Sequence, residues 1–105
     1  MSSADLIIYH IGRLFTCAGE APRRGALLRE LPALSDAALA SFEGRIVYVG
    51  PESGLNGAVT NAPRAVAIDA RGRTVLPGFI DPHTHVVYAG ERLEEFRERL
   101  GGASY

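Results

Sequence analysis

Residues 76–85, LPGFIDPHTH, hold two of the chain's three histidines, and only Thr84 separates them. In a β-strand alternate side chains point to the same face, so His83 and His85 would share one face. Their Cα atoms would lie roughly 6.5–7 Å apart, close enough for both imidazoles to reach one metal ion. In a helix, residues two apart diverge. The spacing therefore predicts a metal site, provided that this segment is extended.

The residues around this histidine pair favour an extended segment. The apolar run before it is typical of a strand, and Pro82, which has no N–H to give to a sheet, is expected where strand pairing ends. In α/β barrels, active sites lie at that end of the strands. Asp81 would either orient an imidazole or cap the turn, and the sequence leaves both roles open. Because a catalytic zinc usually has three protein ligands and a water, the pair alone is an incomplete site.

The chain before this segment indicates a small β-sheet or sandwich, because short β-branched and aromatic stretches alternate with polar turns. Residues 33–41 are alanine-rich, and propensity does not decide between a helical turn and a strand. Loops are expected at 19–32 and 51–63, where Gly, Pro and Asn gather. His10 is expected to be a strand residue without chemistry. The expected strands cover residues 4–17 with a break near Gly12, 45–49 after a turn at Glu43-Gly44, 64–69, and 74–76.

Residues 91–100, ERLEEFRERL, indicate a helix that Gly101-Gly102 would end. Glu95 and Arg99 have the i, i+4 spacing of a favourable ion pair. A buried strand, a loop and then a helix is how a β/α unit begins, and one such unit cannot bury itself. We therefore expect the chain to stop inside a larger domain. The apolar face of this helix would consist of Leu93, Phe96 and Leu100.

Composition indicates a soluble globular protein of 105 residues, with 47% apolar and 22% charged residues. The formal net charge of -1 argues against a nucleic-acid or anionic-membrane partner. Cys17 is the single cysteine, so a disulfide framework is excluded, which fits a reducing compartment. No apolar run approaches the roughly 18 residues of a membrane span, and the N-terminus lacks a signal-peptide pattern. A cytoplasmic protein is expected.

LPGFIDPHTH resembles the signature at the first barrel strand of the amidohydrolase superfamily. Those enzymes join a small β-sandwich, built partly from N-terminal residues, to a (β/α)8 TIM barrel. The resemblance implies an α/β barrel enzyme of which this chain is a mostly β N-terminal fragment. Residues 1–76 would be the N-terminal part of the small sandwich. Residues 77–105 would be the truncated start of the metal-dependent barrel, with its first strand and the start of its first helix.

Residues 83–105 resemble a narrower group, the imidazolonepropionase family of ring-opening hydrolases in histidine degradation. In that family the HTH is followed by an apolar pair, an AG, a polar–Arg pair, an EF and a GASY-like ending. The stretch LLRELPALSDAAL, residues 27–39, also resembles the linker of the family. The matching residues are Val86-Val87, Ala89-Gly90, Glu91-Arg92, Glu95-Phe96 and Gly102 to Tyr105.

This resemblance implies that His83 and His85 ligate one divalent metal ion, zinc or iron. Arg92 would bind the propionate carboxylate of the substrate, a task that suits the planar guanidinium fork, and Tyr105 would line the substrate site. The residues alone favour plainer interpretations, a surface pair between Arg92 and Glu95 and a frayed terminal tyrosine. The remaining ligands, the general base and the acid fall on later barrel strands, so no catalytic residue is expected in this chain.

The implied reaction is hydrolysis of the cyclic amide C–N bond of 4-imidazolone-5-propanoate to N-formimino-L-glutamate. A metal-bound water is the nucleophile, because the cation lowers its pKa toward roughly 7. The fragment by itself would be inactive, and a homodimer is open for the full-length enzyme. One alternative is another cyclic amidase or deaminase of the superfamily, which Arg92 and the GASY ending oppose. The other alternative is a non-catalytic small β protein that binds a partner or a structural metal. Such a protein would leave apolar surface uncovered.

Overall fold

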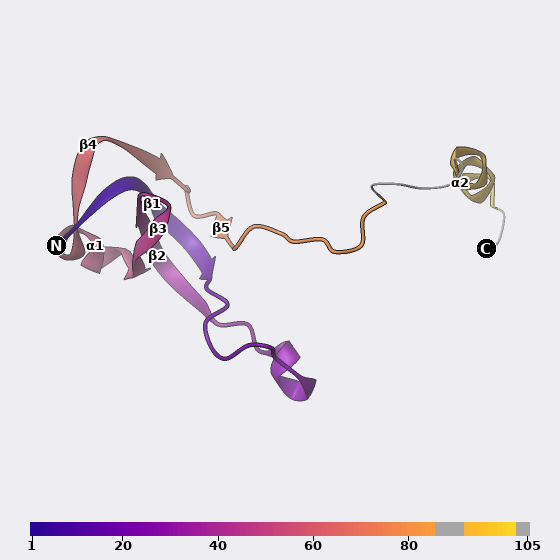
Figure 1. Cartoon of the computed structure of the whole chain (residues 1–105), viewed down its shortest axis with the longest axis horizontal. Coiled ribbons are helices and arrows are strands. Elements are labelled where there is room, and N and C mark those ends of the chain that lie inside the picture. The colour runs from indigo at the N-terminus through magenta and orange to yellow at the C-terminus, as the bar shows by residue number, and fades with distance from the viewer. Residues whose placement is uncertain (86–91, 103–105) are drawn as a thin grey trace.

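The computed structural model describes residues 1–85 and 92–102. Within these residues one mixed sheet forms, with strand order β3-β2-β1-β4 and β5 also paired to β1 (Figure 1). The expectation of a mostly β N-terminal part is confirmed. The strands are β1 Ser2–Phe15, β2 Ala33–Phe42, β3 Arg45–Pro51, β4 Val59–Asp69 and β5 Thr74–Val75.

β1 is the central strand, antiparallel to β2 on one side and parallel to β4 and then β5 on the other. Its register against β2 shifts between Ile8 and Ile11, where His10 has a φ of 51°. The break expected near Gly12 is therefore a bulge inside one strand. Gly12 is needed because a Cβ there would lie 2.1 Å from the carbonyl oxygen of Gly72. This close approach brings the β4–β5 turn onto β1.

β2 and β3 form the expected hairpin, and its turn residues Glu43 and Gly44 both have positive φ, 50° and 77°. Such a turn matches the right-handed twist of the two strands. The alanine-rich segment left open by propensity is strand β2. Ala37, Ala38 and Ala40 are completely buried there. β2 is a strand because it pairs with β1 on one side and β3 on the other, whereas alanine propensity does not distinguish strand from helix here.

Residues 51–63 do not form the single loop expected from their composition. A 3-10 helix at Glu52–Gly54 leads into the short helix α1, Leu55–Ala58, and β4 begins at once with Val59. Leu55 and Val59 are buried and pack in one cluster with β1 and β2 residues. These two apolar side chains anchor a segment whose Gly, Asn and Pro content otherwise indicates a loop. The other residues of that cluster are Ala4, Ile7, Ala38 and Ala40.

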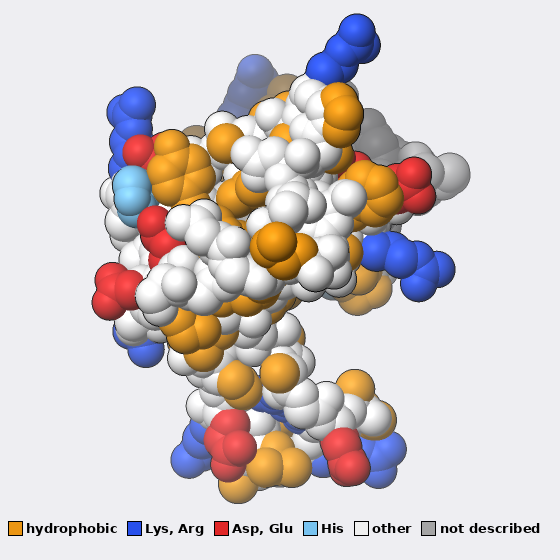
Figure 2. Space-filling view, turned by 90° about the vertical axis from the view of Figure 1, so that its left-hand side faces the viewer, with side chains coloured by type: hydrophobic (Ala, Val, Ile, Leu, Met, Phe, Trp, Pro, Cys, Tyr) orange, Lys and Arg blue, Asp and Glu red, His pale blue; other side chains and the backbone are white. Residues whose placement is uncertain are grey.

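A second buried cluster lies farther along β1, beyond the bulge, and consists of Ile11, Leu14, Ala37 and Ala70. Both clusters are small, and large apolar side chains of the sheet stay exposed, among them Ile46 at 65% and Ile68 at 46%. Figure 2 shows apolar side chains across the face turned to the viewer, with arginines projecting at its periphery. Folded proteins seldom leave this much apolar surface in water without a covering element or partner.

Residues 77–85, expected to hold the first barrel strand, carry no strand in the structure. A strand needs a hydrogen-bonded neighbour, and no described strand lies beside this segment. Phe79 and Ile80 are 90% and 93% exposed. The segment runs away from the sheet as an unpaired stretch (Figure 1).

Helix α2, Leu93–Leu100, starts two residues after the expected residue 91, which lies outside the described residues. It ends as predicted, with Gly102 at a φ of +97°. The radius of gyration is 20.3 Å, against about 13 Å for a compact chain of this length. α2 thus lies apart from the sheet (Figure 1). Among the residues that the structure describes, no helix has the length and apolar character needed to cross a bilayer.

Candidate functional site

The two histidines of the HTH motif lie next to each other. The ring centroids of His83 and His85 are 5.6 Å apart, with an angle of 32° between the ring planes. Two imidazoles bound to one tetrahedral ion at about 2.0–2.1 Å have centroids roughly 5 Å apart. The two rings therefore lie side by side, although residues 83–85 form no strand. Their donor nitrogens suit zinc and iron alike.

Asp81 holds the turn that leads into this pair. Its Oδ1 accepts a hydrogen bond of 2.9 Å from the backbone N–H of His83. Of the two roles that the sequence left open, turn capping is the one seen. The carboxylate fixes the main chain at the first histidine. Within residues 1–85 and 92–102 no group of three or more His, Cys, Asp or Glu side chains converges on a metal position.

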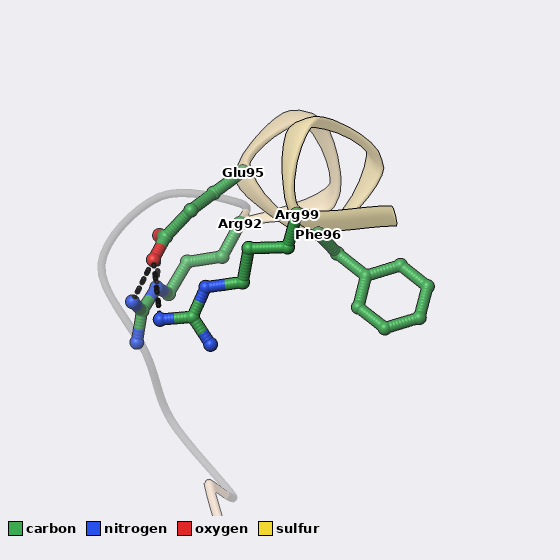
Figure 3. A pocket seen from close by; sticks show the side chains of 4 residues that line it. All are labelled: Arg92, Glu95, Phe96 and Arg99. Atoms are coloured by element: carbon green, nitrogen blue, oxygen red, sulfur yellow. Dashed lines mark hydrogen bonds and ion pairs between the residues drawn. The ribbon is translucent and has the colours of Figure 1, made fainter. Parts of the chain in front are cut away.

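A second constellation lies at the start of α2 (Figure 3). Arg92 donates to Glu95 from Nε at 2.7 Å and from Nη2 at 2.5 Å. Arg99, one turn later, places Nη2 3.6 Å from Oε1 of Glu95, so the expected i, i+4 pair is confirmed. Hydrogen bonding from Arg92, followed by the charges of both arginines, holds the pKa of Glu95 below its usual value. The surface pairing of Arg92 that the residues alone favoured is present.

These charged groups line a shallow surface pocket of about 220 Å³ together with Phe96. Phe96 is 59% exposed and its ring points away from the charged groups (Figure 3), so the pocket has an apolar wall and a charged wall. Such a combination suits a small molecule that has both a ring and a carboxylate tail. Tyr105, expected to line the same site, lies outside the described residues, and so do residues 86–91 between the HTH motif and Arg92.

A third cluster, around His10, was not predicted as a constellation. Nδ1 of His10 lies 3.1 Å from Oδ1 of Asp69, and its Nε2 lies 3.3 Å from Oε1 of Glu52. The backbone N–H of His10 also donates to Oε2 of Glu52 at 2.7 Å. The partners stand 42 and 59 residues away in the chain, so no local pattern signals them. The cluster joins the β1 bulge to two other elements, the 3-10 helix Glu52–Gly54 and the end of β4.

The chain is similar in sequence to known proteins. Residues 66–101 match the model of a family described as "Amidohydrolase family". The chain is 50% identical over 105 residues to an imidazolonepropionase of Symbiobacterium thermophilum. It is 45% identical over 106 residues to the Chloroflexus aggregans imidazolonepropionase and 44% identical over 105 residues to that of Herpetosiphon aurantiacus.

The chain is thus similar to imidazolonepropionases over its whole length. The similarity extends over 100% of this chain and over 24% of the first of these relatives, so the chain spans about a quarter of the length of the imidazolonepropionases that it matches. The family resemblance found in the sequence is thereby confirmed. The amidohydrolase match covers both the HTH motif and the Arg92–Arg99 constellation.

Amidohydrolases as a family imply a divalent metal ion, and the paired imidazoles are a donor set that fits one. Two imidazole donors are half of what a closed tetrahedral site requires.

Proposed function

We propose that this chain is the N-terminal part of an enzyme that hydrolyses 4-imidazolone-5-propanoate to N-formimino-L-glutamate in histidine degradation. The observation that carries this proposal is the unbroken similarity to imidazolonepropionases, at up to 50% identity along the whole chain. The reaction opens a ring by cleaving a cyclic amide C–N bond. It needs a water nucleophile, a group that polarises the carbonyl and an acid that protonates the leaving nitrogen.

We propose a division of the chain at residue 76. Residues 1–76 would belong to the small β-sandwich domain, and residues 77–105 would begin the barrel. Two observations support this division. The sheet ends with β5 at Val75, and its exposed apolar side chains are suited to a second layer. The unpaired 76–85 segment, with Phe79 and Ile80 in solvent, is suited to a place between other barrel strands.

For the metal, His83 and His85 are the proposed ligands, and the ion would be zinc or iron. When bound, such an ion supplies a water of lowered pKa and polarises the amide carbonyl. The chain's own contribution is to hold the two imidazoles side by side, with the Asp81 turn fixing the backbone at the first of them. The further ligands and the general base would come from other parts of the enzyme.

For the substrate, Arg92 is the proposed partner of the propionate carboxylate. A guanidinium meets a carboxylate with two parallel hydrogen bonds, which fixes the orientation of the tail as well as binding it. Tyr105 is proposed to line the same site. Phe96 and Arg92 line the same surface pocket, which supports a site for a small organic acid.

The proposed substrate is a small molecule. The proposed compartment is the cytoplasm, where Cys17 would remain a thiol. Cys17 is free and exposed, as a reducing compartment allows. Neither nucleic acid nor membrane is proposed as a partner, in keeping with the net charge of -1. A homodimer of the complete enzyme stays a prediction.

The test is a ring-opening assay of the complete enzyme with His83→Ala and Arg92→Ala beside it. We expect His83→Ala to lose both bound metal and activity. Arg92→Ala should keep its metal and lower kcat/KM by roughly 10²–10³-fold, because a charge-assisted bidentate contact is removed. Activity on other cyclic amides but not on this substrate would instead indicate a different amidohydrolase. Neither bound metal nor hydrolysis would leave a non-catalytic β protein as the remaining interpretation.

A further inference from the structure

We propose that a hollow beside the first half of β1 binds a small organic cation, an alkylammonium ion with a short apolar chain. The hollow has a volume of about 500 Å³, and none of its lining residues belongs to the HTH motif or to α2. The proposal is therefore separate from the proposed ring-opening function. The lining residues are Ile7, Tyr9, Glu52, Ser53, Leu55 and Asn56.

Two segments that are far apart in the sequence form the walls of this hollow. Ile7 and Tyr9 are alternate residues of β1, so their side chains point to the same face of the sheet. The other wall is the connection between β3 and β4, which consists of the 3-10 helix and α1. This connection is held against β1 at two points. The backbone N–H of His10 donates to Oε2 of Glu52 at 2.7 Å, and Leu55 packs in one cluster with Ile7.

The inner part of the hollow is apolar. Ile7 and Leu55 are 7% and 8% exposed, so only a small part of each reaches the hollow. Tyr9 is partly buried against the same cluster and adds an aromatic ring. Apolar walls of this kind accept a short alkyl chain, and an aromatic ring attracts a cation. The apolar part therefore fits the chain of an alkylammonium ion.

The polar part of the lining is rich in hydrogen-bond acceptors. Of the six lining residues Glu52 alone carries a charge, and it is negative. Its two oxygens offer about four acceptor positions. His10 meets them from its backbone N–H at 2.7 Å and from Nε2 at 3.3 Å, so the carboxylate can accept further hydrogen bonds. The hydroxyl of Ser53 and the amide oxygen of Asn56 add neutral acceptors.

This set of groups favours an ammonium ion over an anion or an uncharged molecule. An ammonium group has up to three N–H donors and no acceptor, which matches a lining that consists mainly of acceptors. Hydrogen bonds between a charged donor and a carboxylate are about twice as strong as those between neutral groups. An anion would instead meet the negative charge of Glu52.

Asp5 offers a matched control for Glu52. Its Oδ2 accepts a hydrogen bond from the backbone N–H of Glu43 at 2.7 Å, the same kind of contact and the same length as that from His10 to Glu52. Asp5 does not line the hollow. Changing either carboxylate to its amide removes one negative charge and leaves an oxygen that can accept from the backbone. Only the change at Glu52 alters the proposed site.

The experiment titrates the complete protein with n-butylammonium chloride and measures binding by saturation-transfer NMR. We expect a Kd of about 1–10 mM, as is usual for so small a ligand in an open site, and binding of n-butanol at least about tenfold weaker. Glu52→Gln should weaken n-butylammonium binding roughly tenfold, because a charge-assisted contact is lost. Asn56→Ala should weaken it about two- to threefold, and Asp5→Asn should stay within about twofold of the unmodified protein.

Thermal unfolding without ligand shows whether each variant is folded. If Glu52→Gln loosens the connection between β3 and β4, the exposed Asn56→Ala decides the question instead. The proposal is overturned if n-butylammonium does not bind or if n-butanol binds equally well. It is also overturned if the folded Glu52→Gln variant binds like Asp5→Asn. Ring opening is not measured, so a protein inactive on 4-imidazolone-5-propanoate would overturn the proposed function and leave this test intact.

Discussion

Gly12 shows how a single residue of β1 is constrained by a segment far along the chain. A Cβ at this position would lie 2.1 Å from the Gly72 carbonyl oxygen, closer than real Cβ atoms approach backbone. The N–H of Gly12 also donates to the carbonyl of Arg73 at 3.1 Å. The β4–β5 turn is thus pressed against β1 at the point where glycine leaves room. The route of the chain toward the HTH motif depends on that contact.

Gly12→Ala is therefore expected to destabilise the protein by about 2–4 kcal/mol, because backbone must move on one side of the contact. Gly57→Ala is the matched control, since its Cβ would meet nothing within 4 Å and its helical position favours alanine. That change should be neutral or stabilise by about 0.5–1 kcal/mol. Denaturant unfolding of both variants measures the difference. Equal midpoints for the two would show that the Gly12–Gly72 contact yields easily.

At the scale of elements, the sequence predicts best what depends on neighbouring residues. The Glu43-Gly44 turn, the stop of α2 and the Glu95–Arg99 pair all follow from local spacing. The adjacency of His83 and His85 follows from their separation by a single residue. Each of these features is complete within a few residues, so no distant partner is needed to decide it.

Features that depend on distant partners could not be predicted in this way. β2 is a strand because β1 and β3 flank it, although alanine prefers helices. The 3-10 helix and α1 form because Leu55 reaches the core across a segment of loop-like composition. His10, at the bulge, contacts Glu52 and Asp69, and no pattern of neighbouring residues predicts these distant partners. The pairing of residues 76–85 is likewise a non-local property, and the described strands do not supply it.

The junction of β4 and its turn should show in the acid stability of the protein. The Arg71 backbone N–H, which donates to Asp69 at 2.8 Å, is the main cause that lowers the pKa of Asp69, and His10 adds to it. A carboxyl whose pKa is lower in the folded state stabilises the fold above its unfolded value of 3.8. This contribution is lost as pH falls through the folded pKa.

Asp69→Asn should therefore be less stable than the unmodified protein at neutral pH, and the two should converge in acid. The measurement is the unfolding midpoint followed from pH 7 down through about pH 3, with the exposed Asp36→Asn as control. The control should stay parallel to the unmodified protein over that range. Parallel curves for Asp69→Asn as well would mean that its carboxylate contributes nothing specific to the junction.

For the molecule as a whole, the decisive feature is apolar surface that the described residues leave uncovered. Ile46 on β3 and Ile68 on β4 are 65% and 46% exposed, and the unpaired stretch adds Phe79 and Ile80. Surfaces of this kind in a folded protein are contacts for another layer or another chain. If the sheet is one layer of a sandwich in the complete enzyme, the same side chains are buried there.

Replacing Ile46 and Ile68 by serine should have opposite effects on the isolated chain and on the complete enzyme. The isolated 105-residue chain should self-associate and bind an apolar dye, and Ile46→Ser with Ile68→Ser should reduce both properties. In the complete enzyme the same pair of changes should lower stability, by about 1.5–3 kcal/mol for each covered side chain. Light scattering and dye fluorescence measure self-association and dye binding of the isolated chain. Denaturant unfolding measures the stability of the complete enzyme. A monomeric isolated chain, or a complete enzyme indifferent to the double change, would show that this face of the sheet is an ordinary solvent-facing surface.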